Sequence, residues 1–391
     1  MLLRNLTIEN YRSFENYKLD GLARVNLFVG DNNCGKTSVL EAVELLCGHD
    51  PLVALERIAF HRGEVVPARS GMSFAKKTTE TCAGFPTGRV VALGQLFKLT
   101  SRVEPAMPLW ELTALIETCS PQLGKFVRGS IEEESVTLTD ANTPREEPDD
   151  EESWQLRLSM RHGTVHGHRR VPVTGDGGLH MQYASGGAMA YGSLPTRHGL
   201  HIVVCGLRGV EGTDMLNVWD HVIRHAQKPL VIESLRLMLP DVQDLDYVPS
   251  LMSNRNPNAG MVVRFSNKTG NGPIGLNSFG DGTQRLFGLA TTIAAGSSGL
   301  ALIDEIDAGL HYSKLPDMWR MVIKAAAELD VQVFATSHSL DCIRALEAAC
   351  DQDESLRDEV ALFSIDRRMD EAVRYGGDEL SVVVEHEIEV R

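Results

Sequence analysis

The stretch that decides the fold is residues 30–38, which read GDNNCGKTS between the apolar run VNLFV and the helical pattern VLEAVELLC. The spacing Gly30-x4-Gly35-Lys36-Thr37, with a strand before it and a helix after it, predicts a phosphate-binding loop. Backbone N–H groups and the positive end of the helix surround the phosphates in such a loop. Lys36 adds a positive charge there, and the Thr37 hydroxyl can bind Mg²⁺. The alternative, a glycine-rich turn without a ligand, is disfavoured by the flanking strand and helix.

A second segment carries two neighbouring carboxylates. Residues 300–305 read LALIDE, which predicts a buried parallel strand that ends at Asp304 and Glu305. Asp304 can hold the Mg²⁺ shell, because ligands of open α/β sheets bind at the carboxyl ends of the strands. Glu305 can polarise an attacking water as a general base. The alternative is a pair of carboxylates that only caps the strand, and the phosphate-binding loop in the same chain disfavours it.

Two further segments add candidate phosphate contacts. The apolar run VQVFATSH ends at His338, which can contact a γ-phosphate and report whether it is present. Ser278, Gly280 and Gly282 lie at the start of an expected helix in NSFGDGTQRLFGLA, which predicts a second anion site. One nucleotide needs only one phosphate-binding loop, so the second site suggests a nucleotide held by another subunit. The alternatives are a structural histidine at a strand end and an ordinary helix cap.

The composition is that of a globular protein of ordinary hydrophobicity. The 391 residues carry a net charge of -15, which disfavours nucleic acid or an anionic membrane as a partner except through a local basic patch. The seven cysteines include no C-x-x-C pair, which favours a reducing cytosol and argues against structural zinc. Arg4 and Glu9 interrupt the amino-terminal stretch, so we expect no signal peptide and a cytoplasmic protein. The uncharged run at 286–303 contains threonine, glycine and serine, and we expect it to form helix, turn and strand.

Helical patterns alternate with apolar strand patterns from residue 278 onward, which predicts an α/β fold with a mixed or parallel sheet. We expect three segments. Residues 1–95 carry the phosphate-binding loop, 96–265 form a central α+β insertion, and 266–391 carry the carboxylates and His338.

Two features of the insertion have more than one interpretation. The stretch RHGTVHGHRR at 161–170 predicts a polar hairpin, with a basic ribbon for nucleic acid or an acidic partner, or a metal site, as alternatives. One apolar helical face predicts ordinary core or a docking surface, and it comprises Leu216, Trp219, Val222 and Ile223.

Taken in this order, the motifs resemble the ABC-type ATPase heads of the OLD, RecF and SMC group, and most closely the small bacterial AAA15/AAA21 ATPases, which are OLD-like. The resemblance spans roughly residues 1–48 and 276–345. It implies a P-loop NTPase fold, ATP and Mg²⁺ as cofactors, and hydrolysis of ATP to ADP and phosphate. It also implies that two heads enclose ATP in a homodimer or a higher homo-oligomer. Ser278 and Gly280 of one subunit would then face the γ-phosphate bound by Lys36 of its neighbour.

The resemblance also assigns roles to further residues. Arg12 in LTIENYRSF matches the arginine that meets the nucleotide, and Gln95 can take the role of a glutamine that senses Mg²⁺. Asn33 stands where SMC-type heads usually carry glycine, a mild departure because asparagine tolerates left-handed backbone. The loop residues expected to contact the nucleotide are Gly30, Asn32, Asn33, Cys34, Gly35, Lys36, Thr37 and Ser38.

The function implied by the resemblance is a nucleotide-dependent switch or scaffold in anti-phage defence. Such relatives carry a Toprim nuclease domain after the ATPase or are encoded beside one, and the roughly 45 residues after the last expected helix are too few for that domain. We therefore expect a separate effector such as a Toprim-type nuclease. The alternative is a RecF- or SMC-like ATPase that binds DNA, which the net charge and the lack of a long heptad arm disfavour. A transporter motor and a small-molecule kinase fit the motifs least.

Overall fold

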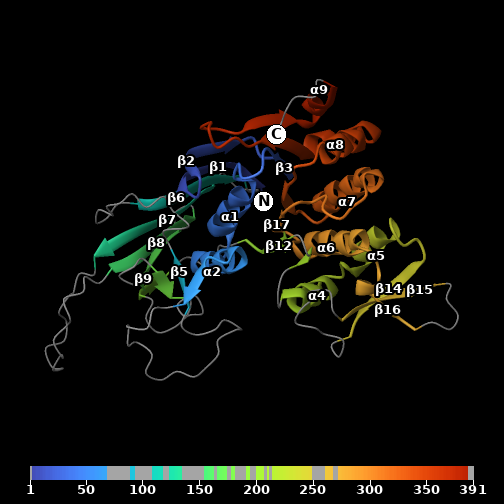
Figure 1. Ribbon diagram of the computed structural model, residues 1–391, viewed down its shortest axis with the longest axis horizontal. Helices are drawn as coiled ribbons and strands as arrows, with labels where there is room; N and C mark the ends of the chain where they lie inside the picture. The colour runs from blue at the N-terminus through green and yellow to red at the C-terminus, as the bar shows by residue number, and fades with distance from the viewer. Residues whose placement is uncertain are drawn as a thin grey trace.

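The computed structural model describes the amino-terminal segment, parts of the central segment and almost all of the carboxy-terminal segment (Figure 1). The described ranges are 2–67, 89–92, 108–117, 123–133, 154–162, 165–173, 178–180, 191–193, 200–206, 209–210, 214–248, 260–266 and 272–385. Gln95 lies outside the described residues. No helix within these ranges is long and apolar enough to cross a bilayer. The run at 286–303 divides into a helix that ends at Ala295 and a strand that begins at Leu300, as expected.

A seven-stranded sheet positions the candidate site. Its strand order is β13-β12-β17-β18-β3-β19-β20, and the strands from β12 to β19 run parallel while the two outermost pairings are antiparallel. The strands are β3 (Val25–Val29), β12 (Ile202–Gly206), β13 (Gly209–Val210), β17 (Leu300–Ile303), β18 (Gln332–Thr336), β19 (Val360–Ser364) and β20 (Val373–Gly376). The predicted α/β fold is confirmed.

Helices cover both faces of this sheet. Successive side chains of a strand point to opposite faces, and here they belong to two different buried clusters. In β3, Phe28 belongs to the cluster formed with α1 and α2, whereas Leu27 and Val29 belong to the cluster formed with α6, α7 and α8. The helices are α1 (Lys36–Cys47), α2 (Pro51–Arg62), α6 (Asp281–Ala295), α7 (Leu315–Glu328), α8 (Leu340–Gln352) and the short α9 (Leu380–Glu385).

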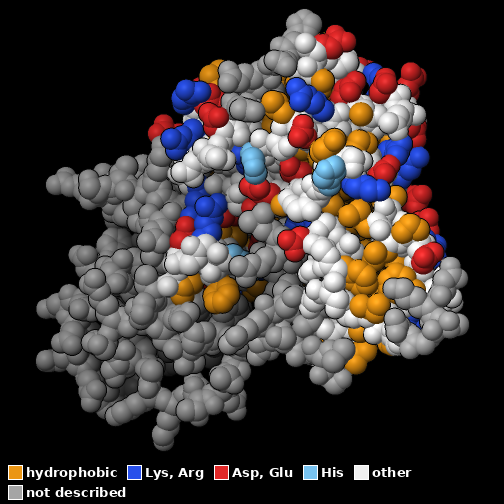
Figure 2. Space-filling model, turned by 45° about the vertical axis from the view of Figure 1, so that its right-hand side comes forward, with side chains coloured by type: hydrophobic (Ala, Val, Ile, Leu, Met, Phe, Trp, Pro, Cys, Tyr) orange, Lys and Arg blue, Asp and Glu red, His pale blue; other side chains and the backbone are white. Residues whose placement is uncertain are grey.

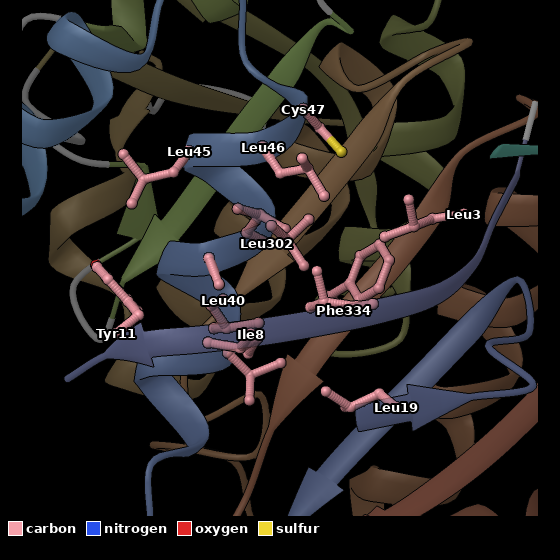
Figure 3. Close-up of a cluster of buried hydrophobic side chains, with 14 of the residues drawn as sticks. Leu3, Ile8, Tyr11, Leu19, Leu40, Leu45, Leu46, Cys47, Leu302 and Phe334 are labelled. Carbon is pink, nitrogen blue, oxygen red and sulfur yellow. The ribbon is translucent and has the colours of Figure 1, made fainter. Parts of the chain in front are cut away.

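Helix α1 lies between the core sheet and strand β1 (Leu2–Tyr11). Figure 3 shows Leu40 and Leu46 of α1 together with Ile8 of β1 and with Leu302 and Phe334 of the core sheet. None of these five side chains is more than 5% exposed. Burial of a side chain of this size contributes about 1.5–3 kcal/mol. The phosphate-binding loop is therefore followed by a firmly packed helix.

A second sheet, antiparallel at every pairing in the described residues, contains the amino-terminal hairpin. Its order is β2-β1-β6-β7-β8-β9-β10-β5-β4, with β11 beside β9. Strands β1 and β2 pair in antiparallel fashion, and the described residues of the 161–170 stretch lie in the antiparallel pair β8 and β9, as the hairpin interpretation predicts. The remaining strands are β2 (Phe14–Asp20), β4 (Val65–Pro67), β5 (Arg89–Ala92), β6 (Pro108–Glu117), β7 (Leu123–Glu133), β8 (Trp154–His162), β9 (Val165–Val173), β10 (Gly178–His180) and β11 (Tyr191–Ser193).

A third unit packs against α6 on the right of Figure 1. It consists of α4 (Asp214–Arg224), α5 (Lys228–Arg236) and a sheet of β14 (Val242–Tyr247), β15 (Met261–Phe265) and β16 (Ile274–Gly275). The Trp219 ring of α4 lies with its centroid 6.1 Å from that of Phe287 of α6. Trp219 and Val222 are buried as core, whereas Leu216 and Ile223 are 41% and 47% exposed.

One strand of the core sheet differs from the sequence-based expectation, and another has a partner that the sequence does not indicate. Strand β12 falls in the segment that the sequence assigns to the insertion, yet it pairs in parallel with β17. Strand β19 lies within the 266–391 segment, beyond the stretch that carries the resemblance, and it pairs with β3 directly before the phosphate-binding loop. A short apolar run carries no signal of its partner strand, because that partner is distant in sequence. The three-segment division as a whole stays a prediction.

Candidate active site

The phosphate-binding loop joins β3 to α1 through backbone that few residue types adopt. Gly30, Asn33 and Gly35 have φ values of 145°, 67° and 110°, and positive φ favours glycine and, less strongly, asparagine. A Cβ at Gly30 would lie 2.5 Å from the Ile365 carbonyl oxygen, and a Cβ at Gly35 would lie 2.5 Å from the Phe14 ring. Both glycines are therefore required by their surroundings as well as by their conformation. The left-handed backbone expected of Asn33 is present.

The loop curves around the lysine and the start of the helix. No side chain caps α1 at Gly35, so the first N–H groups of the helix are left for another acceptor. Lys36 Nζ donates to the carbonyl oxygens of Gly30 at 2.8 Å and Asp31 at 2.9 Å. The positive charge and the free amides thus face the same concave loop, which suits a phosphate chain.

The other loop residues divide by exposure. Asn32 and Asn33 are exposed, whereas Cys34 and Ser38 are each 6% exposed. Phosphate contacts at Cys34 and Ser38 would therefore use their backbone N–H groups rather than their side chains.

Thr37 and Asp304 lie together although they are far apart in the chain. Thr37 Oγ1 lies 3.3 Å from Asp304 Oδ1 and 3.5 Å from Asp304 Oδ2. Strand β18 lies between β3 and β17, so the parallel strands deliver both residues to the same edge of the sheet. Mg²⁺ favours one or two carboxylates and completes its shell with water and phosphate oxygens. The hydroxyl and carboxylate therefore fit Mg²⁺ bound together with a nucleotide.

Glu305 and His338, the expected catalytic residues, are in contact. Glu305 Oε2 lies 3.1 Å from His338 Nδ1, and the two side chains are 33% and 53% exposed. Glu305 has a φ of 50°, a conformation that is costly for a residue other than glycine. Its N–H donates to Thr336 Oγ1 at 2.8 Å, and its carbonyl oxygen accepts from Arg285 Nη2 at 2.6 Å. These two hydrogen bonds hold the carboxylate at the sheet edge next to Asp304.

Thr336 and Arg285 are candidate positioning residues that the sequence analysis does not single out. Thr336 Oγ1 also donates to Asp304 Oδ1 at 2.6 Å. Arg285 is 4% exposed and also donates to the Asp304 carbonyl oxygen at 2.7 Å. A signal for each exists in the sequence, since Arg285 interrupts an apolar helix and Thr336 ends an apolar strand just before the histidine.

We expect Thr336→Val to slow ATP turnover about tenfold or more while leaving ATP affinity within about threefold, because it keeps the shape but removes both hydrogen bonds. Steady-state turnover and nucleotide titration of the purified variant measure the two effects. Thr336→Ser retains the hydroxyl and should remain near wild type. Equal turnover in Thr336→Val and wild type would show that this hydroxyl does not position the carboxylates.

The second predicted anion site lies at an exposed helix start. Ser278 and Gly280 are exposed, and no side chain caps α6 at Gly280. Gly282 packs close to the turn after β17, where a Cβ would lie 3.1 Å from the Gly309 carbonyl oxygen. In the part of the chain that the structure describes, no hydrogen bond or ion pair joins Ser278 to the phosphate-binding loop. A single chain therefore does not bring the two predicted anion sites into contact.

Arg12 lies in a buried ionic network rather than in an open site. Its side chain is 8% exposed, with Nε 3.1 Å from Glu41 Oε2 and Nη1 2.5 Å from Glu64 Oε1. Tyr11 Oη donates to Glu41 Oε2 at 3.1 Å, and Arg62 Nε lies 2.5 Å from Glu41 Oε1. The network joins the β1–β2 turn to α1 and α2. The nucleotide contact that the resemblance implies for Arg12 would require it to leave these carboxylates, and it stays a prediction.

Glu41→Ala should lower the free energy of unfolding by about 3 kcal/mol, because it removes the shared acceptor and leaves Arg12 buried with one partner fewer. Chemical denaturation monitored by circular dichroism measures the change. Glu233→Ala is the matched control, since Glu233 is 72% exposed and pairs only with Arg236 in the described residues, and such surface pairs contribute about 1 kcal/mol or less. A similar small loss in both variants would contradict the network's structural role.

Two family models match the chain. Residues 1–83 match a model described as "AAA ATPase domain". Residues 215–341 match a model described as "AAA domain, putative AbiEii toxin, Type IV TA system". The first range contains the phosphate-binding loop, and the second contains Asp304, Glu305 and His338.

Curated relatives match over a short segment. An "ATP/GTP phosphatase" of Helicobacter pylori is 38% identical over 47 residues, which are 12% of this chain and 13% of that protein. A "DNA replication and repair protein RecF" of Leptospira interrogans is 50% identical over 46 residues, again 12% of this chain and 13% of that protein. The matched segment thus spans about an eighth of each relative. The solved "SMC head domain from Thermotoga maritima" has a TM-score of 0.44 and 12% identity over 96% of this chain and 99% of that chain.

Proposed function

We propose that this chain is an ABC-type ATPase head of the RecF, SMC and OLD-like group that binds ATP with Mg²⁺ and hydrolyses it, as the two ATPase family models and the RecF relative support. The observation that carries the proposal is the contact between Thr37 of the phosphate-binding loop and Asp304 at the end of β17, at 3.3 Å. This contact brings together a phosphate site and a carboxylate that are contributed by two distant parts of the sequence.

Each residue has a distinct role in the proposed reaction. The amides at the start of α1 and Lys36 bind the phosphates, while Thr37 and Asp304 hold the metal. When bound, Mg²⁺ neutralises phosphate charge that develops during transfer. Glu305 orients a water and accepts its proton as the general base, and His338, in contact with Glu305, lies where it can contact the γ-phosphate.

We further propose that a second copy of the chain completes the site. The start of α6 is exposed at Ser278 and Gly280 and is not capped by a side chain, so its N–H groups are available to an anion from outside the chain. A homodimer, or a larger homo-oligomer built from such pairs, would place this helix start on the γ-phosphate held by the neighbouring subunit.

The wild-type chain tests the proposal directly. We expect phosphate release from ATP that requires Mg²⁺ and stops on addition of a chelator, together with a shift to dimer in light scattering when ATP is present. Turnover that is indifferent to the chelator would contradict the metal assignment. A protein that turns ATP over as a strict monomer would contradict the shared site.

The cellular role of ATP binding and hydrolysis by this chain is also a proposal. On the resemblance to OLD-like proteins, we propose a switch that controls a separate effector such as a Toprim-type nuclease in anti-phage defence. DNA cleavage by the purified chain alone would oppose it. The second candidate is a RecF-like role on DNA, favoured by the 50% identity to RecF over 46 residues. ATP-dependent binding to duplex DNA that weakens steeply with salt would support that candidate.

A further inference from the structure

A cavity separate from the candidate active site lies between α2, β12 and α4. Its volume is about 240 Å³, about eight times the roughly 30 Å³ that one water occupies in the liquid. It adjoins the first half of β12, whereas Asp304 and Glu305 follow the end of the parallel neighbour β17. None of the residues assigned to the nucleotide lines it.

The cavity combines an apolar wall with a polar one. Val203, Val210 and Val218 contribute apolar surface, and the polar lining comes from Arg57, His61, His201, Asn217 and His221. This combination, apolar surface with a few converging polar groups, is typical of small-molecule sites. It is not typical of a metal site, and no cluster of three or more metal-binding side chains occurs in the described ranges.

One polar atom in the lining lacks a partner. His221 Nε2 is buried and forms no hydrogen bond with any described residue. Because this atom is covered by its neighbours, the His221 ring acts on an anion in the cavity through the charge of its protonated form rather than through a direct hydrogen bond from Nε2.

The charged side chains around the cavity favour a ligand that carries one negative charge. Arg57 Nη2 lies 2.6 Å from Glu44 Oε1 and its Nε donates to the same oxygen at 2.8 Å. The guanidinium carries five N–H donors, so others remain for a ligand, but Glu44 already offsets its charge. A monoanion suits this balance better than a doubly charged phosphate, and the valine wall suits an organic group.

We propose that the cavity binds a small organic carboxylate, with its anionic group between Arg57 and the imidazole of His221 and its apolar part on Val203, Val210 and Val218. The proposal concerns a different site from the nucleotide and does not rest on ATP hydrolysis.

Three stacked imidazoles make this binding sensitive to pH. His201 and His221 have ring centroids 4.8 Å apart, and His221 and His225 have centroids 3.9 Å apart. Burial lowers the pKa of both His201 and His221, and the neighbouring imidazoles lower them further. The other charged or titratable groups around the stack are Arg57 with Glu44, His61, His49 and Asp220, of which Asp220 raises the pKa of His221.

The sign of the pH effect follows from these shifts. With pKa values below the usual 6.5, His201 and His221 are neutral near neutral pH. A bound anion stabilises the protonated imidazolium, so binding takes up a proton. The affinity for a carboxylate should therefore increase as the pH falls toward the histidine pKa values.

Calorimetric titration of the full chain, without nucleotide, with sodium benzoate tests the proposal. We expect binding that is at least about threefold tighter near pH 6 than near pH 8, since benzoate stays ionised at both and the histidines change. Benzamide, the neutral isostere, should bind at least about tenfold more weakly near pH 6. No binding of benzoate at millimolar concentration, or equal binding of benzamide, would overturn the proposal.

Three variants assign the site, and the first two are a matched pair. His221→Phe keeps an aromatic ring in the stack but removes Nε2, and it should weaken benzoate binding about tenfold and flatten the pH dependence. His225→Phe changes the same stack outside the cavity lining and should leave affinity within about twofold. Val218→Trp fills the cavity and should abolish binding while circular dichroism reports an intact fold. Wild-type affinity in both His221→Phe and Val218→Trp would place benzoate elsewhere and refute the site.

Discussion

Lys36→Ala should weaken ATP binding by about a hundredfold or more, a loss of about 2.7 kcal/mol, and remove measurable turnover. The lysine is the only side-chain cation found within the described loop, and its Nζ is held 2.8 Å and 2.9 Å from two loop carbonyls at the centre of the concave backbone. Removing the charge leaves the amides of α1 as the remaining phosphate ligands. ATP should therefore still bind at the same loop, but more weakly. Fluorescent ATP titration and phosphate release measure both effects.

Lys324→Ala is the matched control for this variant. Lys324 is 55% exposed on α7 and pairs with Asp353, so its loss changes the net charge equally without touching the loop. We expect its nucleotide affinity and turnover to remain near wild type. Unchanged affinity in Lys36→Ala would contradict the assignment of residues 30–38 as the phosphate-binding loop.

Glu305→Gln should retain ATP but slow hydrolysis by about two orders of magnitude or more, as expected for the loss of a general base. Glutamine keeps the size and hydrogen-bonding shape of the side chain, which contacts His338 at 3.1 Å in the wild type. It cannot accept the proton of the attacking water. Because bound ATP would then persist, the variant should also accumulate as an ATP-dependent dimer in gel filtration.

Glu328→Gln provides the comparison, since Glu328 is exposed at the end of α7, away from the sheet edge that carries Glu305. It should turn ATP over at the wild-type rate and show no persistent dimer. Hydrolysis by Glu305→Gln at the wild-type rate would assign the general base to another residue. Slow hydrolysis without any dimer would retain the base assignment but refute the shared site.

The parts of the site that the sequence predicts are those whose signal is local. The loop at 30–38, the strand that ends at Asp304 and the strand that ends before His338 each combine an apolar run with a fixed pattern of polar residues. Parallel pairing then brings the strand ends to one edge, as β3, β18 and β17 show. The contact between Thr37 and Asp304 follows from these rules.

The parts that the sequence does not predict depend on partners far away in the chain. Arg12 pairs with Glu41 and Glu64 because α1 and α2 pack against the β1–β2 turn. The sequence around a glutamate does not indicate which distant arginine will be its ion-pair partner. Strand β19 pairs with β3 more than three hundred residues earlier. Arg285 likewise acts on carbonyls of a different element, the turn after β17.

The most direct test of the central claim is a crystal structure of Glu305→Gln grown with ATP and Mg²⁺. It should show the phosphates on the amides at the start of α1, the metal bonded to Thr37 and Asp304, and Ser278 and Gly280 of a second copy at the γ-phosphate. A nucleotide bound away from residues 30–38, or a metal without Asp304 in its shell, would contradict the account.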